Sequence, residues 1–410
     1  MMPTLRFEEY KDSVLNSSAL SDLCVIKGRI GYRGYTTEDI VKRGDGAIAL
    51  SPSNIDGKLV YNDDTYISWD KYNESPEIMV KVGDIIFVKT GSSYGKSAFV
   101  SHLIEKTSIN PQLVLLKFDD SKESYFVSQV MLGQRFKRHI ETIVVGGAIP
   151  TLSQKELGKF QVYSPTRNEL QKINSLFSLL DQKINLLTKK KEALETYKKG
   201  LMQKIFSQEL RFKREDGSDF PEWATETLDK LCSKCKSGGT PKSTIAEYYN
   251  GNIPFLAISD ITEQGKYLRS TSKSISELGI ENSASWIVPK HSLIYSMYAS
   301  VGFVSINLIP LATSQAVLNL IVDERICLTE YLYYWLYQFQ KNVHVFVTTG
   351  TQGNLNAQTV KSFQVDLPSI KEQEKIILTL SKIDEQISLM HTQIENAATL
   401  KKGLLQQMFV

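Results

Sequence analysis

The sequence predicts an α+β protein in which two strand-rich domains are separated by two long helices that form an intramolecular antiparallel coiled coil. Three observations predict this fold class: an internal repeat, a heptad pattern in two segments, and short apolar runs bounded by polar, Gly-rich loops. The repeat is clearest between FQVYSPTRNELQKI, which begins at Phe160, and FQVDLPSIKEQEKI, which begins at Phe363. The offset of 203 residues holds without a gap to Phe206 and Phe409. The chain is therefore predicted to be a pseudo-two-fold duplication of one unit.

The repeat predicts the order domain, helix, domain, helix. At the front of each copy the match is looser, and Leu5-Arg6-Phe7 recurs as Leu210-Arg211-Phe212. With 410 residues, the chain is long enough for two domains that each bury a core of their own. The predicted boundaries are 1–163 for the first domain, 164–208 for the first helix, 209–365 for the second domain and 366–410 for the second helix.

Both predicted helices carry the seam of a coiled coil. Apolar residues recur at alternating steps of three and four residues over five heptads, which places them on one stripe of each helix. At about 1.5 Å per residue, about forty residues make a helix about 60 Å long, and the intervening domain allows antiparallel pairing within one chain. The alternative is that each helix is merely amphipathic and lies on its own domain. The predicted seam consists of Ile173, Phe177, Leu180, Ile184, Leu187, Leu194, Leu201, Ile376, Leu380, Ile383, Ile387, Met390, Ile394 and Leu404.

Capping and breaking signals lie near the ends of these helices. Thr166-x-x-Glu169 and Ser369-x-x-Glu372 have the form of a capping box, which predicts where each helix begins. Gly200 and Gly403 lie within the repeated KKGL, and glycine costs about 1 kcal/mol in a helix interior. These glycines therefore mark either a close backbone approach or an early helix end.

The two domains are predicted to consist mainly of short strands, with one helix each at Tyr125–Arg138 and Glu330–Gln340. The segment from Ser292 to Val322 lacks charge but is too polar for a membrane span, so it predicts a buried pair of strands. The predicted strands are apolar runs bounded by Gly, Asn and Pro. They lie at Asp84–Val88, Leu113–Lys117, Ile253–Ile258, Leu293–Tyr298 and Val317–Val322.

Composition places the chain among globular cytoplasmic proteins. The 48 Lys and Arg residues against 45 Asp and Glu residues give a net charge of only +3, so any basic surface for a polyanion must be local. Four cysteines in so long a chain do not predict a disulfide framework, and the N-terminus lacks an apolar signal core.

Catalytic and metal-binding motifs are not found. Gly91–Ser97 resembles a phosphate-binding loop, but it has three residues between its glycines where that motif needs four. Cys232-x-x-Cys235 is a single pair, and Cys24 aligns with Cys232 in the repeat, which favours a buried structural position over a zinc site. The five histidines form no H-E-x-x-H pattern. We therefore expect no catalytic residue and no metal in this chain.

The remaining functional signal is a set of polar, basic and aromatic loops at comparable places in the two domains. Lys, Arg, Ser, Thr and backbone amides contact DNA phosphates, and Arg or Lys can also read guanine edges. The alternative for any one of these residues is an ordinary solvated loop. The candidate DNA-binding residues are Lys27, Arg29, Tyr32, Arg33, Tyr35, Ser92, Ser93, Tyr94 and Lys96 in the first domain, and Lys236, Ser237, Gly238, Gly239, Thr240, Lys242, Tyr298 and Ser300 in the second.

With these residues the chain resembles a specificity subunit of a type I restriction-modification system, over nearly its whole length. The first copy departs from the pattern, because Leu170 stands where the second copy has Gln373 and its opening loop lacks Gly-Thr-Pro. The resemblance rests on Gly238-Gly-Thr-Pro-Lys242, on Gly302-Phe303 within Ala299–Val304, on Thr313-Ser-Gln-Ala316, and on the join Asn354-Leu-Asn…Phe363-Gln-Val-Asp-Leu-Pro368…Glu372-Gln373…Ile376.

The resemblance implies two target-recognition domains, each of which reads one half of a split, asymmetric DNA site. It implies that the helices set the spacer between the halves and dock two copies of an adenine methyltransferase subunit, which bind S-adenosylmethionine and flip the target base. It also implies an ATP-dependent translocase-nuclease subunit, so ATP and Mg, like S-adenosylmethionine, are expected on partner subunits and not here.

Two rival functions belong to other classes. The first is a bivalent coiled-coil scaffold that holds protein partners without DNA, which the weak net charge favours. The second is a DNA-modifying enzyme fused to its own DNA-recognition domain. The absence of nuclease and methyltransferase motifs from the sequence argues against this function.

Overall fold

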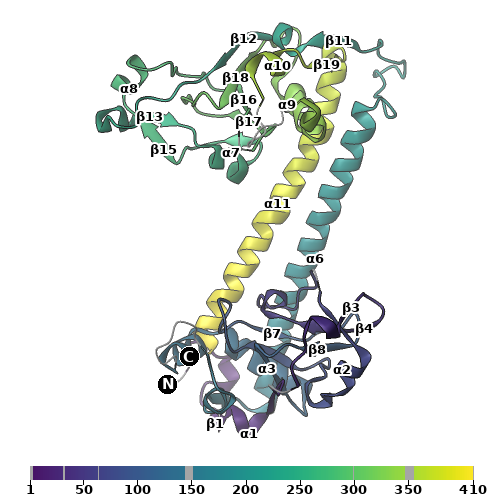
Figure 1. Ribbon diagram of the computed structural model, residues 1–410, viewed down its shortest axis with the longest axis vertical. Helices are drawn as coiled ribbons and strands as arrows, with labels where there is room; N and C mark the ends of the chain where they lie inside the picture. The colour runs from purple at the N-terminus through teal and green to yellow at the C-terminus, as the bar shows by residue number, and fades with distance from the viewer. Residues whose placement is uncertain are drawn as a thin grey trace. The chain divides into compact units, whose positions relative to one another are not determined.

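The computed structural model describes residues 3–30, 33–62, 64–143, 151–298, 300–346 and 355–409. The chain divides into two compact units: unit 1 comprises Met1–Lys189 and His391–Val410, and unit 2 comprises Lys190–Met390. Both divisions fall within the long helices α6 (Arg167–Phe206) and α11 (Ile370–Met408). Each unit therefore contains one strand-rich domain and a part of each helix (Figure 1). The predicted α+β fold class with two long helices is confirmed.

Unit 1 contains two four-stranded sheets. The first has the order β2-β9-β6-β7, and the second has the order β3-β5-β4-β8. The strands are β1 (Asn16–Ala19), β2 (Val25–Gly28), β3 (Ile40–Val41), β4 (Gly46–Leu50), β5 (Tyr66–Ser68), β6 (Ile85–Val88), β7 (Ser97–Phe99), β8 (Thr107–Ile109), β9 (Leu113–Lys117) and β10 (Gln161–Ser164). The helices before α6 are α1 (Leu20–Leu23), α2 (Trp69–Asn73), α3 (Ser121–Leu132), α4 (Gln134–Ile143) and α5 (Gln154–Gly158).

Unit 2 contains one five-stranded sheet with the order β12-β18-β16-β17-β14 and a separate pair, β13 with β15. The strands are β11 (Ala224–Thr227), β12 (Cys232–Ser237), β13 (Tyr249–Phe255), β14 (Tyr267–Leu268), β15 (Lys273–Ile275), β16 (Leu293–Ser296), β17 (Val304–Asn307), β18 (Val317–Val322) and β19 (Gln364–Leu367). The helices before α11 are α7 (Ile258–Gln264), α8 (Glu277–Glu281), α9 (Thr329–Phe339) and α10 (Ala357–Lys361).

The internal repeat appears in the strand order of the two main sheets. Strands β2-β9-β6-β7 of unit 1 correspond to β12-β18-β16-β17 of unit 2. In both units an antiparallel pair also joins the start of the domain to its end: β1 pairs with β10, and β11 pairs with β19. The chain thus enters and leaves each domain at one place, next to the start of a long helix.

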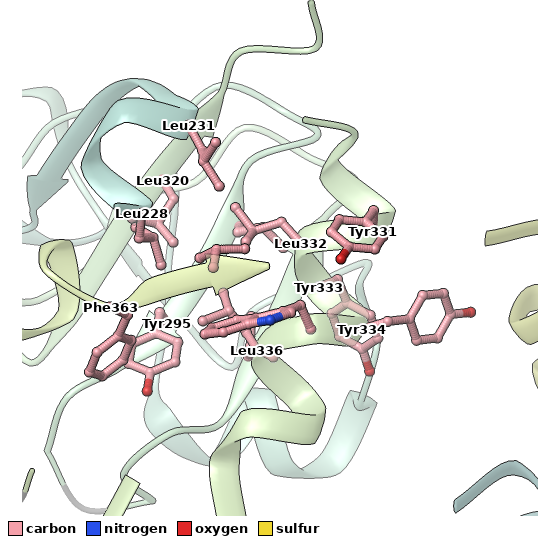
Figure 2. Packing of buried hydrophobic residues seen from close by; sticks show 14 of the residues in the cluster. Leu228, Leu231, Tyr295, Leu320, Tyr331, Leu332, Tyr333, Tyr334, Leu336 and Phe363 are labelled. Atoms are coloured by element: carbon pink, nitrogen blue, oxygen red, sulfur yellow. The ribbon is translucent and has the colours of Figure 1, made fainter. Parts of the chain in front are cut away.

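The core of unit 2 forms between the main sheet and α9. Figure 2 shows aromatic and leucine side chains of α9 facing side chains from the sheet and from the segment before β12. Tyr295, Tyr331 and Tyr334 are fully buried, and burial of a large apolar side chain stabilises a fold by about 1.5–3 kcal/mol. This aromatic packing explains why the uncharged segment that follows Ser292 lies inside the protein.

The predicted strands agree with the structure except in detail. The segment from Ser292 to Val322 forms three strands, where two were predicted, and α7 begins at Ile258, inside the predicted strand Ile253–Ile258. The predicted helix Tyr125–Arg138 is two helices, because Gly133 adopts an extended conformation between α3 and α4. A Cβ atom on Gly133 would lie 3.0 Å from the carbonyl oxygen of Val130 and 3.5 Å from that of Phe409, so Phe409 packs against this break.

The long helices pack against each other in both units. In unit 1, Ile173 and Phe177 of α6 share a core with Leu405 and Met408 of α11, so the start of one helix meets the end of the other. In unit 2, residues near the end of α6 likewise share a core with the start of α11. All fourteen predicted seam residues are buried or half-buried.

Near the C-terminal end of each long helix, a buried residue lies one position after the predicted seam residue. Met202 and Leu405 are buried, whereas the predicted Leu201 and Leu404 are only half-buried. An α-helix drifts by about 20° per heptad relative to a 3.5-residue repeat, so about one residue is lost over five heptads. Continuation of both helices past Gly200 and Gly403 also excludes an early helix end at these glycines.

The helices begin where the capping signals predict, α6 at Arg167 after Thr166 and α11 at Ile370 after Ser369, but the two glutamates bind other partners. Both carboxylate oxygens of Glu169 accept hydrogen bonds from Arg6, at 2.9 and 2.5 Å, and both of Glu372 accept from Arg211, at 3.2 and 3.0 Å. Ser369 Oγ has no hydrogen-bond partner among the described residues. The glutamates instead anchor the segment that precedes each domain to the first turn of the long helix that follows it.

The described helices include none that is long and apolar enough to cross a membrane.

Candidate nucleic-acid interface

In unit 2 the candidate DNA-binding loops meet at one end of the main sheet. Ser237, the last residue of β12, pairs with Leu318 near the start of β18. Ser296, the last residue of β16, pairs with Val317, the first residue of β18. The loops that follow β12 and β16 therefore leave the sheet at this end, which we call the loop end of unit 2.

The loop after β12 is held by very close backbone packing. A Cβ atom on Gly238 would lie 1.9 Å from the carbonyl oxygen of Thr313, and one on Gly239 would lie 2.5 Å from the carbonyl carbon of Ala284. The Gly239 amide donates to the Thr313 carbonyl at 2.9 Å. Both glycines are buried, so they serve the packing of the loop, and their side-chain-free positions cannot be filled by another residue.

Polar side chains connect the same loop to the segment before β18. Thr240 Oγ1 donates to Gln315 Oε1 at 2.6 Å. Asn319 Nδ2 donates to Thr313 Oγ1 at 2.8 Å and to the Lys236 carbonyl at 3.1 Å. The Gly-Gly-Thr-Pro-Lys and Thr-Ser-Gln-Ala motifs, more than seventy residues apart in sequence, thus form one structure. Lys236 and Lys242 are exposed beside it.

Trp286 belongs to this loop end and was not found from the sequence. Its indole Nε1 donates to the Ser237 carbonyl at 3.1 Å. The Lys234 ammonium lies 4.0 Å and the Lys236 ammonium 5.8 Å from the centre of its ring. Because alternate residues of a strand point to one side, Lys234 and Lys236 present two ammonium groups on one face of β12. The Lys-x-Lys alternation next to a rare tryptophan was the available signal.

The loop after β16 contains Tyr298 and Ser300. Tyr298 is exposed, Ser300 is half-buried, and the amide of Met297 donates to the Ala316 carbonyl at 2.9 Å. This hydrogen bond attaches the loop to the segment that also holds Thr240. Ala299, between the two candidates, lies outside the described residues.

Unit 1 has an equivalent loop end. Gly28, the last residue of β2, pairs with Val114, and Val88, the last residue of β6, pairs with Leu113 at the start of β9. The loops that contain the candidates of the first domain follow β2 and β6. The two loops occupy the same places in the strand order as those of unit 2.

Lys27, in β2, is exposed, whereas Arg29, in the loop that follows β2, is buried. The Arg29 guanidinium donates to the carbonyls of Ile109 and Arg33, at 3.0 and 3.1 Å, and to Ser108 Oγ at 3.0 Å. Burial lowers the pKa of Arg29, and its guanidinium lies 5.5 Å from the ring centre of Tyr35. Arg29 and Tyr35 therefore organise this loop internally, and we leave them out of the proposed contacts. Tyr32 lies outside the described residues.

Arg33, in the same loop, is held by the carbonyl of Glu74 at 3.1 Å and by the carboxylate of Glu77 at 3.7 Å. In the second loop Ser92 and Lys96 are exposed, and the Lys96 ammonium pairs with Asp56 at 2.9 Å. Ser93 and Tyr94 are half-buried.

The Tyr94 hydroxyl donates to the Ile140 carbonyl at 3.2 Å, and burial raises the pKa of this phenol. Tyr94 therefore attaches the loop to α4. Lys89, directly after β6, is a further basic residue at this loop end that was not found from the sequence. Burial lowers the pKa of its ammonium.

Comparisons with known proteins agree with this architecture. A family model described as the type I restriction modification DNA specificity domain matches residues 221–400. The type I restriction enzyme MjaIX specificity subunit of Methanocaldococcus jannaschii is 27% identical over 209 residues, which are 50% of this chain and 48% of that protein. The MjaVIII specificity subunit of the same organism is 22% identical over 352 residues, 80% of this chain and 79% of that protein. The predicted resemblance to type I restriction-modification specificity subunits is confirmed: the chain is similar to them in residues 221–400 and, at lower identity, over most of its length.

Two solved structures share the fold of this chain. The S subunit of a type I system from M. genitalium is 15% identical with a TM-score of 0.62, and the match covers 100% of this chain and 99% of that one. A second structure of a type I restriction-modification system is 15% identical with a TM-score of 0.56, and the match covers 97% of both chains.

The exposed side chains at both loop ends can donate hydrogen bonds and carry positive charge. The exposed groups are ammonium groups, hydroxyl groups and one phenol, which donate hydrogen bonds to anionic oxygen atoms. Within the described parts of the chain, no group of three His, Cys, Asp or Glu side chains could hold a metal ion.

Proposed function

We propose that this chain is the DNA-recognition subunit of a type I restriction-modification complex, and that each domain reads one half of a bipartite, asymmetric site. One observation carries the proposal: in both units, corresponding strands of the main sheet end in basic, polar loops at the same end. The loops differ in sequence between the units, which suits two different half-sites. The rival scaffold function gains no support from the relatives.

The proposed contacts are the exposed members of the two loop ends, together with the half-buried Trp286 beside Lys234 and Lys236. Their ammonium groups neutralise DNA phosphates. Their exposed hydroxyl groups and the Tyr298 ring can contact the DNA backbone and the edges of the bases. In unit 2 they are Lys234, Lys236, Thr240, Lys242, Trp286 and Tyr298, and in unit 1 they are Lys27, Ser92 and Lys96.

The proposed partners on the helices are two modification subunits. Tyr197 in unit 2 and Leu400 in unit 1 are exposed apolar residues at repeat-related positions, 60% and 54% accessible. Each is followed three residues later by a glycine, Gly200 or Gly403, at which a Cβ atom would meet no described heavy atom within 4 Å. Residues three apart share a helix face, so each face offers an apolar contact beside a position where another helix can approach closely.

Catalysis belongs to the partners in this proposal. The modification subunits bind S-adenosylmethionine and transfer the methyl group, and restriction subunits use ATP and Mg. This chain contributes binding and position only.

Titration with duplex DNA at two salt concentrations tests DNA binding. A random-sequence duplex is bound by phosphate contacts, so affinity falls steeply between about 50 and about 200 mM salt. The double variant K236A/K242A removes two ammonium groups, and the slope of log K against log salt becomes shallower by about 1.8. The control is K230A, because Lys230 is exposed but precedes β12 and pairs with Glu226. Binding that does not depend on salt, or equal slopes for all variants, contradicts the proposal.

A further inference from the structure

A polar cluster in unit 2 connects the two long helices to each other and to the domain. Lys198 of α6 pairs with Asp384 of α11 at 2.5 Å, and their side chains are 14% and 26% exposed. The Tyr334 hydroxyl, from α9, donates to the other carboxylate oxygen of Asp384 at 2.6 Å. Tyr334 is one of the aromatic residues of α9 in Figure 2. One carboxylate thus binds a helix on one side and the domain on the other.

Unit 1 contains the same cluster with the roles of the helices exchanged. Lys401 of α11 pairs with Asp181 of α6 at 2.6 Å, and the Tyr125 hydroxyl, from α3, donates to Asp181 at 2.8 Å. Asp181 and Asp384 are related by the offset of the repeat, and so are Lys198 and Lys401. We call each Lys–Asp–Tyr cluster a clamp.

The two clamps require one and the same antiparallel register. Lys198 follows Asp181 by 17 residues on α6, and Lys401 follows Asp384 by 17 residues on α11. In antiparallel helices these equal separations allow both pairs to form together. The clamps are therefore two independent markers of one alignment.

The apolar seam by itself discriminates poorly between registers. Leu187, Leu194 and Leu201 recur every seven residues on α6. If α6 slipped by one heptad along α11, these leucines would be replaced at the seam by other leucines, so the apolar packing would change little. The same slip destroys at least one clamp. Lys401 would face Asn174 or Thr188 in place of Asp181, and neither carries a charge.

We infer that the Lys–Asp pairs of the two clamps are the positioning residues that select the register of α6 and α11, and that they thereby set the spacer length of the DNA site. The inference rests on the proposed function, in which the helices determine the spacer. A polar pair at a coiled-coil seam costs some stability but specifies register, because the wrong register leaves a partly buried charge without its partner. The tyrosines then attach each domain to the helix pair at the same carboxylate.

The test uses the clamp of unit 1, because in unit 2 a second ammonium, Lys266, lies 3.8 Å from Asp384 and complicates charge reversal. The variants are D181N, K401M, the charge exchange D181K/K401D, and Y125F, which removes only the tyrosine hydroxyl. The full chain is produced with its modification subunits in a host, and methylated adenines are sequenced across the genome. The readout is the spacer length between methylated half-sites.

The expected result is that D181N and K401M lower the preference for the native spacer over its neighbours by about tenfold, while both half-site sequences persist. D181K/K401D restores the preference, because the opposite arrangement of charges specifies the same register. Y125F and the control K402M, at an exposed neighbouring lysine, keep the native spacer. Circular dichroism on each purified complex establishes that the variants are folded.

Two outcomes overturn the inference and are distinguishable. If the complex with the wild-type chain methylates bipartite sites with one spacer and the complex with folded D181N keeps that spacer unchanged, the clamps do not select the register, although the proposed function stands. If the unmodified chain directs methylation to no bipartite site, the proposed function fails and the inference fails with it.

Discussion

At the scale of single residues, several side chains act through partners that are distant in sequence. Glu169 and Glu372 look like capping residues, but they bind arginines more than 160 residues away. Arg29 looks like a DNA contact in a basic loop, but its guanidinium satisfies buried backbone and hydroxyl groups. Residue type and local spacing identified the importance of these positions but not their roles.

The carboxylates of the two clamps differ in the number of cations that they neutralise. Asp384 faces Lys198 and Lys266, whose side chains are 14% and 11% exposed, whereas Asp181 faces Lys401. We therefore predict that D384N lowers the free energy of unfolding by about 2–4 kcal/mol and D181N by about 1–2 kcal/mol. Urea denaturation measures both values. Equal losses of unfolding free energy would show that the second ammonium group, Lys266, does not need Asp384 to neutralise its charge.

Because the protein buries tyrosine side chains, we predict that its free energy of unfolding falls at alkaline pH. Burial, reinforced by Asp181 and Asp384 respectively, raises the pKa of Tyr125 and Tyr334 well above the ordinary value of about 10. The unfolded chain therefore releases these protons first, so the stability that the neutral phenols provide is complete below pH 10 and falls as pH rises above it.

Thermal melts between pH 9 and 11.5 test this slope, with the pH values chosen to bracket the ordinary tyrosine pKa of about 10. Y125F and Y334F should flatten the decline, and absorbance of phenolate should show that these rings titrate only on unfolding. A decline that both variants leave unchanged assigns it to other groups.

At the scale of elements, the long helices combine an inner seam with outer faces that this chain leaves open. The seam drifts by one residue from the heptad positions, so Met202 and Leu405 become the buried residues near the helix ends. The outer faces carry Gly200 and Gly403, which no contact within the described chain explains. If the helices had only to pair with each other, alanine would be tolerated at both positions in place of glycine.

We predict that G200A and G403A each stabilise the isolated chain by about 0.5–1 kcal/mol, because alanine is the better helix former and its Cβ meets no described atom. Urea denaturation measures the gain. The bulkier G200L and G403L should weaken binding of the modification subunit by at least about tenfold, through a loss on the order of 1.4 kcal/mol, while leaving DNA binding unchanged. Unaltered assembly with both leucine variants contradicts docking at these faces.

At the scale of the whole molecule, duplication accounts for the proposed recognition of an asymmetric sequence by one chain. The main sheets of the two units have the same strand order, but their loop ends differ: unit 2 has a Gly-Gly-Thr-Pro-Lys loop beside Trp286, and unit 1 has a loop organised by buried Arg29. Each domain also begins and ends at one antiparallel strand pair. This closure predicts that domains can be exchanged as modules.

Exchange of residues 209–365 for the corresponding domain of another specificity subunit should therefore change one half-site and leave the other half-site and the spacer unchanged. Sequencing of methylated adenines in a host with the modification subunits provides the measurement. A change in both half-sites would contradict modular recognition.

Insertion of one heptad into both helices should lengthen the spacer and keep both half-sites. Seven residues extend a helix by about 10 Å, which corresponds to about three base pairs at 3.4 Å each. The same sequencing experiment checks the result. A spacer that stays unchanged would show that the helices do not determine it.

The sequence by itself determined the duplication, the two long helices, the fold class and the loops that carry the candidate DNA contacts. Each of these depends on a repeat or on periodic, local patterns that can be counted along the chain. Only the tertiary structure decided that the Gly-Gly-Thr-Pro-Lys and Thr-Ser-Gln-Ala motifs form one loop end, that Arg29 is buried, and that Asp181 and Asp384 form the clamps. The physical reason is that these roles depend on pairings between distant segments, which local periodicity does not specify.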